Sequence, residues 1–197
     1  MKKEYFSVLV LLLLLLFYSH SNGNQNSFFA PNAKKDYEKI VKLQQETEQS
    51  FLETHDFDIK IKGCENVILA LNEFLKNYPN DKHNVTFTPD LESWKTKKFA
   101  FTSEQNMLIN KLSSLLGKKA GETAQKKHPM SKIEAIDLAS QDKHTVGEKL
   151  NLTNVYSVRM KGKMLGKSIF KLSITTSGSI DTEDKSVLVN DKAQVEE

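Results

Sequence analysis

Arginine is almost missing from this chain of 197 residues. Of its 28 lysine and arginine side chains, only Arg159 is an arginine. The planar guanidinium group is the side chain best shaped to bind phosphates and base edges, so its scarcity argues against nucleic-acid recognition. The formal net charge of +3 is close to balance and argues the same way. We therefore predict a protein without a nucleic-acid partner.

Cysteine is equally scarce. Cys64 is the only one, so the chain cannot close a disulfide within itself. Many small secreted domains depend on such bridges, and this chain must be stabilised by an ordinary hydrophobic core instead. Cys64 stands at the start of a helical apolar pattern, and we predict that it is buried. The alternative is a thiol that is available for a bridge to another protein.

The common motifs of metal, phosphate and nucleophile chemistry are lacking as well. The histidines after residue 23 are far apart and form no metal-binding pattern: His55, His83, His128 and His144. The segment 162–168 has three residues between its glycines, where a phosphate-binding loop needs four. No Gly-x-Ser-x-Gly elbow is present. We predict neither a metal site nor a cofactor.

One thiol–imidazole pair has to be weighed as a catalytic site, Cys64 with His55. A strand predicted between them would hold them roughly 25–30 Å apart, too far for proton transfer. Asp56 and Asp58 share the face of that strand opposite Phe57 and are expected to be solvated. The sequence thus favours a noncatalytic protein. A hydrolase whose site is assembled from scattered residues is the alternative.

A leucine-rich block opens the chain. Its nonionic stretch, Tyr5 to Tyr18, would cover about 21 Å as a helix, whereas the hydrocarbon core of a bilayer is about 30 Å thick. Lysines precede the block, and the small residues Ser21 and Gly23 follow it, a pattern typical of a secretory signal peptide. We predict a signal peptide over 1–23, cleavage after Gly23, and a secreted, extracellular protein with no stable membrane anchor. An uncleaved signal anchor is the alternative.

Two sequons support an extracellular glycoprotein. Asn84 and Asn151 each begin an Asn-x-Ser/Thr triplet that would accept a glycan in a eukaryotic secretory pathway.

Apolar spacing predicts the elements of the first two thirds of the chain. A polar lead-in over 24–32 would end at Asn32 as a helix cap. The elements that follow are a helix over 33–53, a strand over 55–62, a helix over 64–78, strands over 84–88 and 97–102, a helix from Ser103 to Leu116, and a mobile basic loop over 117–129.

The last third alternates like an antiparallel sheet. One parity is apolar in two long runs joined by a turn-forming link over 161–166: Leu150, Leu152, Tyr156, Val158 and Met160, then Phe170, Leu172, Ile174 and Thr176. A turn at Ser177–Gly178 would lead to a final strand over 180–189, and residues 133–138 add another strand. We expect most of the core here, with Phe57, Leu71 and Phe74 packed against the sheet.

Helices and strands do not alternate regularly, so a parallel doubly wound sheet is excluded. We predict an α+β fold, a curved antiparallel sheet with two or three packed helices, as one domain over 33–189 followed by a flexible acidic tail over 190–197. The plan resembles that of the cystatin-like and NTF2-like cone folds. This resemblance is architectural, since no motif of either family is present.

A basic cluster lies on the predicted hairpin, on both sides of its turn: Arg159, Lys161, Lys163, Lys167 and Lys171. It could present a positive edge to an anionic partner, or its lysines could protect an edge strand from unwanted pairing. The sequence therefore predicts a secreted binding or interaction protein whose ligand is a protein, a glycan or a small molecule.

Overall fold

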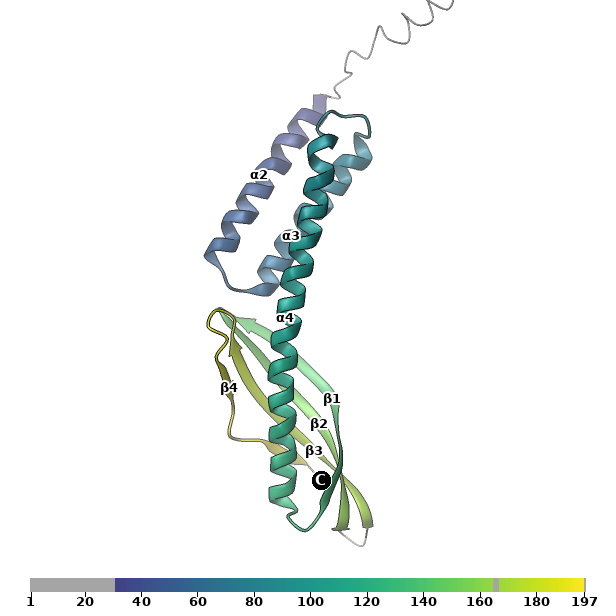
Figure 1. The fold of residues 1–197 in the computed structure, drawn as a ribbon, viewed down its shortest axis with the longest axis vertical. Coiled ribbons are helices and arrows are strands. Elements are labelled where there is room, and N and C mark those ends of the chain that lie inside the picture. The colour runs from purple at the N-terminus through teal and green to yellow at the C-terminus, as the bar shows by residue number, and fades with distance from the viewer. Residues whose placement is uncertain (1–30, 165–166, 197) are drawn as a thin grey trace, which may run out of the picture.

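The computed structural model describes residues 31–164 and 167–196; the leucine block and the predicted cleavage site lie outside this part. Within these described ranges, three helices come first: α2 (Pro31–Glu53), α3 (Phe57–Asn77) and α4 (Asn84–Lys127). Five strands follow: β1 (Lys132–Val146), β2 (Lys149–Met164), β3 (Lys167–Asp181), β4 (Val187–Val189) and β5 (Gln194–Glu196). The predicted α+β fold with a curved antiparallel sheet and packed helices is confirmed (Figure 1).

The molecule is elongated, and α4 runs along most of its length (Figure 1). Helices α2 and α3 lie beside the first half of α4, and the sheet lies against its second half. Two clusters of buried side chains result. The helical core includes Cys64, Leu71, Phe74, Phe87 and Trp94. The sheet core includes Leu108, Leu112 and Leu116 from α4 and the inward-facing side chains of β2 and β3.

The predicted strand over 55–62 is wrong, because these residues link α2 to α3 and form the first turns of α3. The carboxylate of Asp56 caps the helix and accepts hydrogen bonds from the backbone N–H groups of Asp58 and Ile59 at 2.8 and 3.4 Å. Phe57 and Ile61 stand one helical turn apart and both pack on the sheet core, while Ile59 is 51% exposed. An apolar alternation this short is therefore compatible with a helix as well as with a strand.

The predicted strands over 84–88 and 97–102 are also wrong, since α4 is one helix of 44 residues. Its buried stripe changes partners along its length. Phe87, Leu91 and Trp94 face the helical core, and the stripe facing the sheet core starts at Leu108. Between Trp94 and Leu108 the one buried side chain is the polar Gln105. The apolar period is interrupted there, which is why the sequence pattern suggests separate elements.

The predicted mobile loop over 117–129 is wrong for a different reason. Its glycines belong to α4 and allow the sheet to approach the helix closely. A Cβ atom on Gly121 would lie 2.9 Å from Cδ1 of Ile136, and one on Gly117 would lie 3.4 Å from the ring of Tyr156. These glycines mark a packing contact rather than a break in the helix.

The sheet confirms the predicted alternation. Strand order is β1-β2-β3-β4, all antiparallel, and β5 pairs with β3. The inward-facing side chains of β2 and β3 named above are all buried. The predicted turn at Ser177–Gly178 is wrong, because β3 continues to Asp181. Gly178 lies against β4, where a Cβ atom would come 2.6 Å from the carbonyl oxygen of Leu188.

Two further expectations differ from the structure. Phe57 packs on the sheet core as predicted, but Leu71 and Phe74 belong to the helical core. The stretch 190–197, predicted as a flexible tail, contains β5, whose Val195 pairs with Ile174 of β3. Within the part of the chain that the structure describes, no helix has an apolar stretch long enough to cross a bilayer.

Candidate functional site

The basic residues predicted as a binding edge lie on the outer face of the sheet, at its hairpin end. Met160 and Leu172 point toward α4 and are buried, so their neighbours Arg159, Lys161 and Lys171 point away from it and are exposed. The register places Arg159 directly opposite Lys171 across β2 and β3. The side chains of Lys163 and Lys167 lie outside the described residues.

Lys132, which the sequence analysis missed, completes the cluster. It stands directly opposite Lys161 across β1 and β2. We call Lys132, Arg159, Lys161 and Lys171 the cation cluster. No sequence signal singles out Lys132, because the pairing register alone brings it beside a residue 29 positions away.

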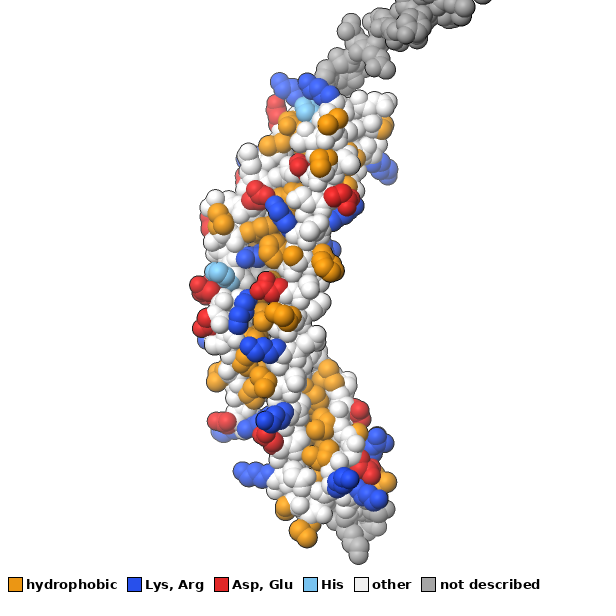
Figure 2. Space-filling view, viewed as in Figure 1, with side chains coloured by type: hydrophobic (Ala, Val, Ile, Leu, Met, Phe, Trp, Pro, Cys, Tyr) orange, Lys and Arg blue, Asp and Glu red, His pale blue; other side chains and the backbone are white. Residues whose placement is uncertain are grey.

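The cation cluster contains two like-charge pairs and lacks neutralising partners. Like charges directly opposite each other on neighbouring strands destabilise a sheet. Among the described residues, none of the four forms a side-chain hydrogen bond or an ion pair within 4 Å. Figure 2 shows acidic and basic side chains interspersed over the helical half.

Protection of a sheet edge explains only part of the cation cluster. β2 is an inner strand, paired with β1 on one side and β3 on the other along Arg159 and Lys161. Lysines protect edge strands, whose backbone N–H and C=O groups are unpaired. The strand is paired on both sides at Arg159 and Lys161, so edge protection does not explain these two residues. The cluster adjoins a shallow hollow of about 280 Å³ that includes Ser157, Lys171, Ser173 and Glu196.

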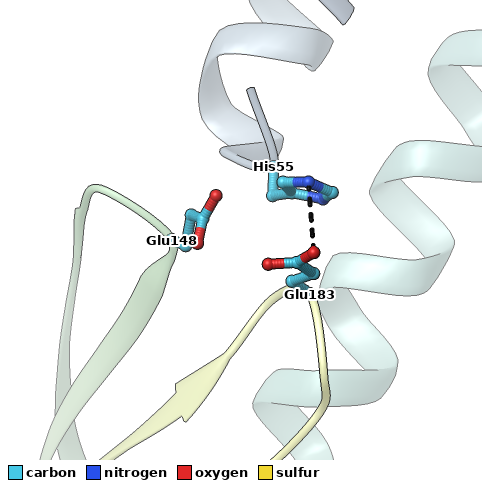
Figure 3. A group of neighbouring side chains, drawn as sticks. All are labelled: His55, Glu148 and Glu183. Carbon is cyan, nitrogen blue, oxygen red and sulfur yellow. Dashed lines mark ion pairs between the residues drawn. The ribbon is translucent and has the colours of Figure 1, made fainter. Parts of the chain in front are cut away.

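A second polar region lies where the helical half meets the far end of the sheet. The link between α2 and α3 approaches two sheet turns there, and His55, Glu148 and Glu183 point toward one another (Figure 3). His55 Nε2 lies 4.0 Å from Glu183 Oε1. We call these three residues the junction triad. The widely separated histidines in the sequence do not reveal this arrangement.

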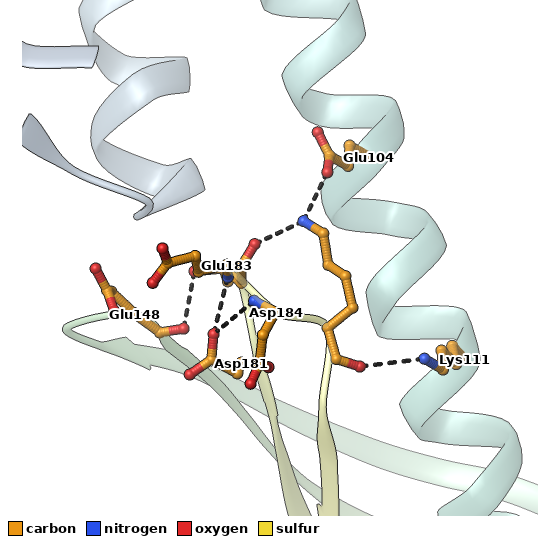
Figure 4. A network of polar contacts seen from close by, with 8 residues as sticks. Glu104, Lys111, Glu148, Asp181, Glu183 and Asp184 are labelled. Atoms are coloured by element: carbon orange, nitrogen blue, oxygen red, sulfur yellow. Dashed lines mark hydrogen bonds and ion pairs between the residues drawn. The ribbon is translucent and has the colours of Figure 1, made fainter. Parts of the chain in front are cut away.

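Backbone hydrogen bonds hold the turns beneath the junction triad (Figure 4). Both the N–H and the hydroxyl of Thr182 donate to the carbonyl oxygen of Glu148, at 2.7 and 2.8 Å. The carboxylate of Asp181 accepts from the N–H groups of Glu183 and Asp184. The bonds of Thr182 join the β1–β2 turn to the β3–β4 turn, and those of Asp181 stabilise the β3–β4 turn itself.

Lys185 ties the same region to α4. Its ammonium group donates to Glu104 Oε1 at 2.7 Å and to the carbonyl oxygen of Thr182 at 2.6 Å. Lys111 of α4 donates in turn to the carbonyl oxygen of Lys185 (Figure 4). Lys185 has φ of 63°, a left-handed conformation that is uncommon for a lysine.

Asp58 connects α3 to α4 and β1. Its carboxylate accepts hydrogen bonds from Gln105 Nε2 at 2.8 Å, Lys143 Nζ at 3.0 Å and Thr145 Oγ1 at 2.9 Å. Partial burial by itself would raise the pKa of Asp58, but the three hydrogen bonds outweigh it and lower the pKa below the usual value. Asp58 is exposed to solvent as predicted, but the sequence did not indicate its three hydrogen bonds to α4 and β1.

The lowered pKa of Asp58 predicts a loss of stability in acid. Its contribution is present above the unfolded pKa of 3.8 and disappears as the pH falls through the lower folded pKa. Asp58→Asn should cost about 1 kcal/mol or less at pH 7, because the carboxylate is 48% exposed and solvent screens it. Thermal melts from pH 7 to pH 2.5 should show the difference from the parent protein shrinking below about pH 4. A constant difference across that range would contradict this role.

The two sequons lie in different surroundings. Asn84 is the first residue of α4, and its Nδ2, the atom that would carry a glycan, donates to the carbonyl oxygen of Tyr78 at 2.8 Å. Asn151 lies on the outer face of β2, opposite His144, and its Nδ2 donates to the carbonyl oxygen of Lys149. Asn151 is the more accessible acceptor of the two.

Cys64 is unpaired and fully buried in the helical core, as predicted. Desolvation raises the pKa of its thiol, which is the opposite of what a nucleophilic cysteine needs. His55 lies at the junction with the sheet, and the two residues do not share a site. The structure thus provides no geometry for a thiol enzyme at this pair.

Comparison with known proteins yields no relative. No family model, curated protein or solved structure matches this chain. The cation cluster and the junction triad are therefore the features that bear on its function.

Proposed function

We propose that this is a secreted, noncatalytic binding protein that holds an anionic partner on the outer face of its sheet. The observation that carries the proposal is the pair of like-charge contacts in the cation cluster. Arg159 opposes Lys171, and Lys132 opposes Lys161, without acidic partners among the described residues. An anion bound across these strands would turn a repulsive arrangement into an attractive one.

The shape of the surface favours an acidic glycan as the partner. Neighbouring strands are about 4.8 Å apart, so three strands present the four cations over a patch roughly 10 Å across. Lysine ammonium groups act as mobile point charges, which suit sulfate or carboxylate groups repeated along a chain. The hollow beside Lys171 adds the hydroxyl groups of Ser157 and Ser173, which can hydrogen-bond to a sugar.

The burial of Cys64 and its separation from His55 support a noncatalytic role. The enzyme alternative would need nucleophile and base within hydrogen-bond reach. Among the described residues, no hydrogen bond joins Cys64 to His55, and Cys64 is enclosed in the helical core, away from solvent.

The glycan proposal predicts charge-dependent binding to immobilised heparin. Replacing both Arg159 and Lys171 with alanine should weaken binding at least about tenfold, equivalent to about 1.4 kcal/mol. Binding should also fall steeply with salt, because the cations are exposed and screened. A matched control, Lys42→Ala with Lys95→Ala, removes the same charge from the helical half and should bind within about twofold of the parent protein.

Two outcomes would overturn the glycan proposal. One is equal binding by the cluster variant and the control variant. The other is binding to vesicles that contain phosphatidylserine, with no retention on heparin, which would identify an anionic lipid surface as the partner.

Secretion is tested separately from binding. We expect the protein recovered from culture medium to begin at Asn24 when its N-terminus is sequenced, because small residues precede that position. Recovery only from membranes, with residues 1–23 still attached, would contradict secretion.

A further inference from the structure

We infer that the junction triad binds a zinc ion. His55, Glu148 and Glu183 come from three segments far apart in the sequence, the α2–α3 link, the β1–β2 turn and the β3–β4 turn. One ligand atom of each lies within 4.8 Å of the other two. Figure 3 shows the imidazole and both carboxylates directed at the same space.

The donor set selects the metal. An imidazole nitrogen with two carboxylate oxygens suits zinc, whereas calcium and magnesium prefer oxygen ligands alone. Zinc lies about 2.0–2.2 Å from such ligands, so tetrahedral ligand atoms are about 3.3–3.5 Å apart. His55 Nε2 and Glu183 Oε1 are 4.0 Å apart, and the three ligand atoms lie within 4.8 Å of one another, so they would have to come closer by roughly 0.5–1.5 Å to bind one ion. The side chains are 43% and 61% exposed, so they are free to make this adjustment.

The local charge also favours a cation. In the part of the chain that the structure describes, the carboxylates of Glu148 and Glu183 form no ion pair with a lysine or an arginine. Lys185, which follows Glu183 in the β3–β4 turn, is directed to Glu104 and to the carbonyl oxygen of Thr182 instead (Figure 4). Two carboxylates thus share the space with a single imidazole, and a divalent cation would neutralise them.

The backbone under each ligand is held before any metal binds. The carbonyl of Glu148 accepts both bonds from Thr182, and Asp181 caps the turn that carries Glu183. His55 directly precedes the helix cap Asp56, whose N–H donates to Thr54 Oγ1. Held backbones reduce the conformational entropy that binding would cost.

Zinc at this place would join the helical half to the sheet. Outside α4, the described side-chain hydrogen bonds between these halves are those of Asp58 with Lys143 and Thr145. A metal held by one ligand from the α2–α3 link and two from the sheet turns would add a second tie on the other side of α3's first turn. This inference does not depend on the glycan proposal, because the two sites lie at opposite ends of the sheet.

Calorimetric titration of the tag-free protein with zinc chloride, after removal of metal with EDTA, tests the site. We expect one zinc ion per chain with micromolar affinity and a rise in Tm, because the ion binds the folded state. His55→Gln and Glu183→Gln should each weaken binding at least about tenfold. His144→Gln serves as the matched control, since His144 is also an exposed histidine at this end of the sheet but lies outside the triad.

Circular dichroism of each metal-free variant checks folding, and His55→Gln keeps the test valid if Glu183→Gln fails to fold. Three results would overturn the inference: no zinc binding below about 100 µM, equal zinc affinity in the parent protein and His55→Gln, or loss of binding in His144→Gln alone. Calcium provides the last comparison. Calcium binding as tight as that of zinc, and unchanged in His55→Gln, would also overturn the zinc assignment.

Discussion

Replacing Leu172 with alanine should lower the free energy of unfolding by roughly 2–5 kcal/mol, whereas Lys171→Ala should change it by less than about 0.5 kcal/mol. Leu172 is 1% exposed in the sheet core and stands opposite Val158 of β2, so truncation leaves a cavity beside α4. Lys171 points to solvent and opposes Arg159. Its loss removes a repulsion and could even stabilise the sheet slightly.

Thermal melts of the two variants measure this contrast. For a chain of this size, 1 kcal/mol shifts Tm by about 2–4 °C, so Leu172→Ala should melt visibly earlier than the parent protein. Adjacent residues are a strict test because a register shift of one residue exchanges the two faces of a strand. If Leu172→Ala left Tm unchanged and Lys171→Ala lowered it strongly, the two faces of β3 would be assigned the wrong way round. The cation cluster would then not lie on the outer face of the sheet.

Ser103→Pro should cost about 3 kcal/mol or more, because Ser103 lies in the interior of α4. Proline there removes a backbone hydrogen bond and clashes with the preceding turn. The damage should be large for a second reason: α4 contributes several buried side chains to each core, and a kink near Ser103 falls between Trp94 and Leu108. We expect urea denaturation to show a lower midpoint and a less cooperative transition.

Ser103→Ala distinguishes a continuous α4 from the helix that the sequence predicts to begin at Ser103. If a helix began at Ser103, alanine would remove its cap and cost about 1 kcal/mol. Inside a continuous helix, alanine should be neutral or stabilising by a few tenths of a kcal/mol. A tolerated Ser103→Pro together with a costly Ser103→Ala would show that α4 is two elements.

The sequence predicts a strand and a separate helix over residues 97–116, whereas the structure has one continuous helix there. This difference has a physical cause. A helix that keeps one partner shows an unbroken apolar stripe, and its period can be recognised in the sequence. Between Trp94 and Leu108, α4 passes from the helical core to the sheet core, and the intervening turns carry no buried apolar side chain, only the partly buried Phe101 that packs against both cores. Local alternation around Phe99 and Phe101 then resembles a strand, although Phe99 is 73% exposed on the helix.

The candidate sites show a similar division. The sequence indicated the basic residues of the hairpin because they are close together along two neighbouring strands. It could not place Lys132 opposite Lys161, since that contact depends on the β1–β2 register and its shift between Ile133 and Ala135. The junction triad left no sequence pattern, because its members are brought together by the packing of two sheet turns against a helical link.

The sequence by itself determined the sheet. Leu150 to Met160 and Phe170 to Thr176 alternate over long runs, and a strand buried on one face must repeat with a period of two. It also determined the first helix and the exclusion of a parallel doubly wound fold. The tertiary structure decided the rest: short apolar runs such as 55–62 satisfy either period, and glycines such as Gly121 and Gly178 allow close packing as well as turns. Only the packed neighbours select between these possibilities, because the free energy that distinguishes them comes from burial against residues far away in the chain.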